Sequence, residues 1–82
     1  MPTFVAKGLA IPTKQERAEM MAGTRVRTSH RDYGMEWYSG SGGRVLVIRG
    51  GFEYGWAKNH REAVAAIDEM ADVNIAGSPL SL

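Results

Sequence analysis

Six residues near the middle of the chain have the types and spacing best suited to binding an anionic partner. Three arginines fall within residues 23–31, which contain no acidic side chain. Two more flank an aliphatic run, and a tyrosine lies shortly before it. Guanidinium groups donate paired hydrogen bonds to phosphates and carboxylates alike. The predicted partner-binding residues are Arg25, Arg27, Arg31, Arg44, Arg49 and Tyr38, with a solvated edge of scattered charge as the alternative interpretation.

A glycine-rich segment, residues 39–43, resembles a phosphate-binding loop, because glycines let backbone N–H groups approach an anion. Nucleotide loops join a strand to a helix N-terminus, whereas this segment is expected to join two strands. Gly40 and Gly43 match the Gly-x-x-Gly of KH domains, but those domains place it between helices. Ser41 lacks the glycine spacing of a nucleophile elbow. We therefore interpret 39–43 as a flexible hairpin loop.

Histidines and carboxylates do not complete a catalytic or metal site. His30 with Asp32, and His60 with Glu62, each offer two ligands, whereas a catalytic zinc site usually has three from the protein. Two glutamates, at positions 36 and 53, fall on one predicted sheet face beside an arginine, an arrangement typical of surface ion pairs. The sequence predicts no metal, no cofactor and no enzymatic activity.

Length and composition predict one small domain over residues 1–82, expected to be monomeric. The chain has 82 residues, is 44% hydrophobic and 23% charged, and contains no cysteine, which favours a reducing compartment such as the cytoplasm. No apolar run reaches the length of a membrane span. Residues 1–49 carry eight Lys and Arg against four acids, and residues 50–82 carry two against five. This split predicts a polarised surface, provided that the two halves do not fold face to face.

The pattern of apolar residues predicts an α+β fold with a three-stranded antiparallel sheet over 33–38, 44–49 and 52–57. A tight turn at Gly50–Gly51 would pair Val45 with Trp56 and place Trp37 on the same face. That shared face is expected to be buried, although its aromatic residues are also of the kind that stack on bases in a single-strand groove. The remaining members of the predicted face are Met35, Val47, Phe52 and Tyr54.

Two helices complete the predicted fold. The main helix, over 60–72, has Asn59 as its N-cap and an apolar stripe that would cover the sheet. A short helix over 14–22 begins with the capping box formed by Thr13 and Glu16. Residues 2–12 are expected to be an edge strand or extended arm, residues 24–31 a loop or solvated edge strand, and residues 73–82 a flexible tail.

A short reading frame from Met1 without cysteine, with one sheet, one main helix, polarised charge and no catalytic set, resembles the small inhibitors encoded by bacteriophages. Among these it looks most like an anti-CRISPR protein. The resemblance implies an inhibitor that binds a type I CRISPR surveillance complex (Cascade) in the bacterial cytoplasm and blocks target DNA binding or nuclease recruitment. It carries over no individual residue, because that class has no common motif.

The competing interpretation is a small DNA-binding module. Three strands followed by a helix are also similar to the arm-type domain of phage integrases and to the AP2 domain, which lay a sheet in the major groove. The acidic residues on the predicted sheet face weigh against this, because they would be repelled by phosphates. A structural or accessory phage protein is the third interpretation.

Overall fold

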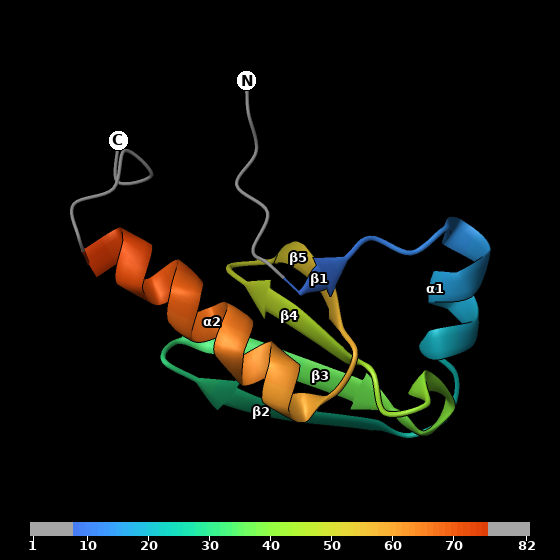
Figure 1. Ribbon diagram of the computed structural model, residues 1–82. Coiled ribbons are helices and arrows are strands. Elements are labelled where there is room, and N and C mark those ends of the chain that lie inside the picture. Colours follow the sequence, from blue (N-terminus) through green and yellow to red (C-terminus); the bar gives the residue numbers. More distant parts are fainter. Residues whose placement is uncertain (1–7, 76–82) are drawn as a thin grey trace.

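The computed structural model describes residues 8–75, which form an α+β fold around one antiparallel sheet (Figure 1). The five strands lie in the order β1-β5-β4-β3-β2. The elements in chain order are β1 (Leu9–Ala10), α1 (Lys14–Met20), β2 (Arg25–His30), β3 (Tyr33–Tyr38), the 3-10 turn η1 (Ser39–Ser41), β4 (Val45–Arg49), β5 (Phe52–Ala57) and α2 (His60–Ile75). The predicted three-stranded sheet is therefore wrong, because one further strand pairs at each of its edges.

The strand β2 pairs with β3 along its whole length. Only Val26 in this strand is aliphatic, so the sequence indicated a loop as strongly as a strand. The turn between the two strands consists of Arg31 and Asp32, with φ angles of 51° and 69°. Both angles are positive, as a type I′ hairpin turn requires. The sequence did not predict this turn, because Arg-Asp is not one of the glycine-containing pairs typical of it.

A β-bulge in β5 shifts its register against β4. Ile48 lies opposite Glu53, yet the preceding Val47 lies opposite Gly55, so that Tyr54 has no partner across the pair. Gly55 has a φ of 142°, and a Cβ there would lie 3.1 Å from the carbonyl oxygen of Ala10 in β1. The bulge therefore occurs where a glycine allows both an unusual backbone angle and the close approach of the neighbouring strand.

The bulge places the two tryptophans on opposite faces of the sheet, so the predicted shared face is wrong. Trp56 pairs with Leu46 and packs with Met20 of α1. Trp37 lies on the α2 side, where its ring contacts the His60 ring edge-on, with 5.8 Å between the ring centres. The predicted register holds before the shift, in the hairpin formed by β3 and β4 and at the turn between β4 and β5.

The helix α2 covers one face of the sheet, as predicted (Figure 1). It begins where expected, because the Oδ1 of Asn59 accepts a hydrogen bond from the N–H of Glu62 at 2.8 Å. It continues to Ile75, so the first residues of the predicted tail are helical, and the remainder, 76–82, lies outside the described residues. The buried core between sheet and helix consists of Tyr33, Met35, Val45, Val47, Ala57, Ala63, Ala66, Ile67, Met70 and Ala71.

The short helix α1 lies at one end of the sheet and packs on the face opposite α2. Its capping box is present as predicted: Thr13 N–H donates to Glu16 Oε1 at 3.0 Å, and Glu16 N–H donates to Thr13 Oγ1 at 3.1 Å. The helix ends at Met20, two residues before the predicted end. Of the predicted arm 2–12, Leu9–Ala10 form the edge strand β1, and residues 1–7 lie outside the described part of the chain.

The segment 39–43 is held in place by specific contacts. The Oγ of Ser41, a buried residue, accepts from the N–H of Tyr38 at 2.8 Å and donates to the carbonyl oxygen of Met20 at 3.0 Å. The N–H of Gly40 donates to the carbonyl oxygen of Ala22 at 2.9 Å. The segment joins two strands, β3 and β4, as predicted, and its first three residues form a packed 3-10 turn that attaches α1 to the end of β3.

Candidate interaction surface

The structure brings together three of the six predicted binding residues on the sheet face away from α2. Arg25 lies opposite Tyr38 in the β2–β3 pair, and Arg27 lies opposite Glu36. Because side chains directly opposite each other in a sheet point to the same face, these four residues form one cluster. We call Arg25, Arg27, Glu36 and Tyr38 the β2–β3 face.

Glu36 organises this face. Its side chain is only 6% exposed, and its Oε2 accepts from the Nε of Arg27 at 2.9 Å. The hydroxyl of Tyr38 donates to its other oxygen at 3.4 Å. A buried carboxylate needs such partners to offset the loss of hydration. The pairing fixes the Arg27 side chain, which remains 59% exposed and so keeps donors available to a partner.

Arg25 is the unpaired cation of the β2–β3 face. Its side chain is exposed and makes no hydrogen bond or ion pair with any residue in 8–75. An exposed guanidinium without a carboxylate partner keeps its whole hydrogen-bonding fork for a ligand. The two arginines of this face thus differ, because one is held in position and the other is free.

The other predicted arginines lie elsewhere and have other partners. Arg31 reaches across to α2, where it contacts Asp68 at 3.2 Å and Asp72 at 3.3 Å. The guanidinium carbon of Arg49 lies 5.0 Å from the ring centre of Tyr33, a cation–π distance, on the α2 side. Arg31 and Arg49 therefore do not join the β2–β3 face.

The contacts of Arg31 belong to a charged cluster that ties the β2–β3 turn to α2. His30 Nε2 lies 2.8 Å from the Oδ1 of Asp68, which also accepts from Arg31. The hydrogen bond from His30, and then that from Arg31, hold the pKa of Asp68 below its usual value of 3.8. The basic first half and the acidic second half of the chain thus meet here, and the predicted polarised surface is partly neutralised.

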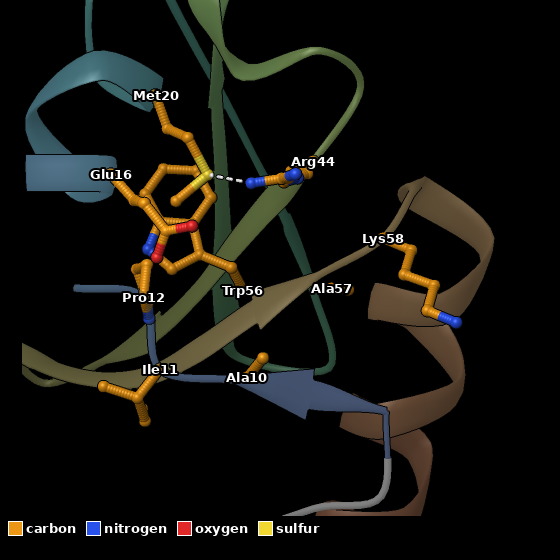
Figure 2. Close-up of a pocket in the computed structure, with 9 residues that line it drawn as sticks. All are labelled: Ala10, Ile11, Pro12, Glu16, Met20, Arg44, Trp56, Ala57 and Lys58. Atoms are coloured by element: carbon orange, nitrogen blue, oxygen red, sulfur yellow. Dashed lines mark hydrogen bonds between the residues drawn. The ribbon is translucent and has the colours of Figure 1, made fainter.

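Arg44 lies beside a pocket between α1 and β5 (Figure 2). The pocket has a volume of about 290 Å³ and a floor formed by Trp56, which is 4% exposed. Arg44 donates a hydrogen bond to the Sδ of Met20, a weak acceptor, at 3.1 Å. The side chain of Lys58 extends away from the pocket, in the direction opposite to that of Arg44 (Figure 2). Ile11, 72% exposed, stands at the rim. No pattern in the sequence indicated this pocket, because the pocket depends on the bulge that turns Trp56 to this face.

Two exposed residues of β2 are not among the predicted binding residues. Val26 is 43% exposed on the α2 side of the strand, and Ser29 is exposed on the opposite side. Both lie on an outer strand whose far side no residue in 8–75 pairs with. The alternation of residues 25–30 was the available signal, but a loop was an equally good interpretation of it.

Within the described range 8–75, no group of three or more His, Asp or Glu side chains could hold a metal ion. The same part of the chain has no helix long and apolar enough to cross a membrane. No protein-family model, curated protein sequence or solved structure matches this chain.

Proposed function

We propose that this protein is a non-catalytic anti-CRISPR inhibitor that binds a type I CRISPR surveillance complex in the bacterial cytoplasm and blocks target DNA binding or nuclease recruitment. The observation that carries the proposal is the β2–β3 face, where Arg25 and Arg27 stand exposed beside Tyr38. The choice of partner comes from the resemblance in size and organisation to phage-encoded inhibitors. The binding surface comes from the geometry.

The arrangement of the β2–β3 face favours tight binding without chemistry. Glu36 holds Arg27 and Tyr38 before a partner arrives, so less side-chain freedom is lost on association. Tyrosine and arginine are the residue types most enriched among those that dominate the binding energy of protein interfaces. A rigid hairpin that presents these side chains supports a stoichiometric inhibitor.

The charge balance of this face favours a protein partner over bare DNA. Arg27 is neutralised by Glu36, and on the same side of the sheet Arg17 forms an ion pair with Glu53. Affinity for DNA grows with the number of phosphates that unpaired cations neutralise, and such cations are few here. A mixed face with local charge complementarity is suited to selecting one protein surface.

The test is to replace Arg25 by glutamate and measure binding to a purified type I surveillance complex. We expect the wild-type protein to bind the complex and to prevent it from binding target DNA. Arg25→Glu should weaken binding by about tenfold or more, because it reverses the free charge at the centre of the proposed interface. Arg61→Glu is the matched control, since Arg61 is exposed in the first turn of α2 and makes no ion pair within residues 8–75.

A parallel titration with duplex and single-stranded DNA separates the two leading interpretations. We expect no binding of bare DNA at micromolar protein concentration and physiological ionic strength. Micromolar binding of DNA together with no capture of the surveillance complex would overturn the proposal in favour of a DNA-binding module. Equal binding of the complex by both glutamate variants would show that the β2–β3 face is not the interface.

A further inference from the structure

The two edges of the sheet differ in a way that bears on partner binding. At one edge, β1 has two residues and is followed closely by Pro12, which cannot donate a backbone hydrogen bond. At the other, β2 runs for six residues without a proline, and nothing in the described range 8–75 pairs with its outer side. Proteins usually block a long free edge, because its unpaired backbone groups accept further strands.

The backbone groups on the outer side of β2 can be identified from one hydrogen bond. The N–H of Ser39 donates to the carbonyl oxygen of Thr24 at 3.0 Å, so Thr24 directs its backbone toward the β3 side. In an antiparallel pair the direction alternates from residue to residue. Arg25, Arg27 and Ser29 therefore direct their backbone N–H and C=O groups away from β3, toward the side on which no strand of residues 8–75 pairs.

The side chains of β2 define the strand that fits this edge. Arg25 and Arg27 lie on the face away from α2, and Val26, between them, lies on the α2 side. Residues opposite each other on neighbouring strands share a face, and opposite charges or apolar pairs stabilise them. β2 contains no acidic residue. A complementary strand therefore carries two acids separated by one aliphatic residue.

We propose that the free edge of β2 binds an extended acidic segment of a partner protein, which adds to the sheet as a sixth antiparallel strand. Backbone bonds to Arg25, Arg27 and Ser29 supply affinity, and the acid–aliphatic–acid alternation supplies selectivity. This inference deepens the proposed function and rests on it for the identity of the partner, because it assigns the chemistry recognised beside the β2–β3 face.

A second copy of this chain is a poorer occupant of the same edge. If two β2 strands paired in antiparallel fashion, the Arg25 and Arg27 side chains of both copies would lie on the same face of one continuous sheet. Like charges on adjacent strands are destabilising, and neither strand would contribute a carboxylate. The charge of the strand therefore selects a different, acidic chain.

The experiment titrates the isotope-labelled full chain with a blocked peptide of sequence Thr-Val-Glu-Val-Glu and follows backbone amides by NMR and hydrogen exchange. We expect the amides of Arg25, Arg27 and Ser29 to shift and to gain protection. A peptide with lysine in place of each glutamate should bind at least about tenfold more weakly, and Arg25→Glu should reverse that preference. Binding of both peptides with equal affinity would overturn the proposal, as would the absence of shifts in β2.

Ser29→Pro and Ser29→Ala form the matched pair of variants. Proline removes an outward N–H while leaving the bonds to β3, so the fold is retained and peptide binding should fall by about tenfold or more. Alanine keeps the N–H and should bind within about twofold of the wild type. If Ser29→Pro unfolds, a peptide N-methylated at its glutamates tests the same backbone bonds on the other strand, because residues opposite Arg25 and Arg27 direct their N–H groups toward β2. Unchanged binding by the methylated peptide, or dimerisation of the chain through β2 in sedimentation, would overturn the proposal.

Two outcomes distinguish this inference from the proposed function. A protein that binds the surveillance complex but not the peptide refutes strand addition and leaves the inhibitor proposal standing. A protein that binds the peptide through β2 but no surveillance complex supports strand addition and refutes the inhibitor proposal.

Discussion

The sheet face under α2 and the face that carries α1 are built from different kinds of contact. The sheet and α2, a helix of 16 residues, share a cluster of ten buried residues, five contributed by the strands and five by the helix. On the other face, α1 has seven residues and contributes Met20 to a cluster of three that also contains Leu46 and Trp56 of the sheet. The rest of that face carries ion pairs and the exposed arginines of β2.

A small chain can combine stability with an open surface when its two sheet faces divide these roles. Burial of apolar area is the main source of folding free energy, and here most of it lies on one face. The second face needs only a small cluster to anchor α1, which leaves the arginines of β2 exposed. The following predictions test that division.

The largest expected effect is that of Trp56→Ala. It removes the largest side chain of the three-residue cluster and should lower the free energy of unfolding by about 3–5 kcal/mol, measured by urea denaturation. If the clusters are separate, amide exchange in the folded variant should rise in α1 before it rises in α2. Equal loss of protection in both helices would contradict the separation.

Gly55→Ala should have the next largest effect, because Gly55 forms the bulge that assigns side chains to the two faces. An alanine there would keep a φ of 142° only with strain, and its Cβ would press against the carbonyl oxygen of Ala10. We expect a loss of about 1–3 kcal/mol in the free energy of unfolding. Gly51→Ala is the control: its φ is also positive, at 82°, but nothing lies within 4 Å of the added Cβ. An equal loss in both variants would show that contact with β1 does not matter.

Asp68 provides a test by pH of how α2 is attached to the β2–β3 turn. Hydrogen bonds from His30 and Arg31 lower its pKa in the folded protein below the usual 3.8. Its contribution to stability is therefore complete above the unfolded pKa and is lost as pH falls through the folded pKa. We expect Asp68→Asn to lower the thermal midpoint at pH 7, and the difference from wild type to shrink as the pH falls below 3.8. A difference of constant size across this range would mean that the carboxylate charge plays no part.

The smallest expected effect is that of Asp32→Gly in the turn between β2 and β3. Asp32 has a φ of 69°, which glycine adopts without a steric penalty. Relief of this strain stabilises the folded protein, whereas the greater conformational freedom of glycine stabilises the unfolded chain. The two effects oppose each other, so the free energy of unfolding should change by about 1 kcal/mol or less. Peptide binding at β2 should be unchanged. A large loss of stability would indicate that the Asp32 side chain holds the turn.

The candidate binding residues were only partly predictable from the sequence. Clustering of Arg25 and Arg27 follows from their spacing of two once β2 is known to be a strand. Their separation from Arg31 does not follow, because Arg31 lies in the turn and pairs with Asp68, a residue 37 positions further along the chain. The role of Glu36 as the buried partner of Arg27 likewise required the register of β2 against β3.

Features that depend on residues close together in the chain could be predicted from the sequence alone. The Thr13–Glu16 capping box, the Asn59 cap and the apolar stripe of α2 formed as predicted, because each involves contacts within one or two helical turns. Which side chains share a face of the sheet depends instead on the register between strands, and this required the folded structure. One unpaired residue in β5 moved Trp56 to the other side of the sheet, because side chains alternate along a strand and a shift of one residue reverses the face of all that follow. That shift occurs where Gly55 lies against β1, and a contact between segments so far apart in the chain leaves no local pattern.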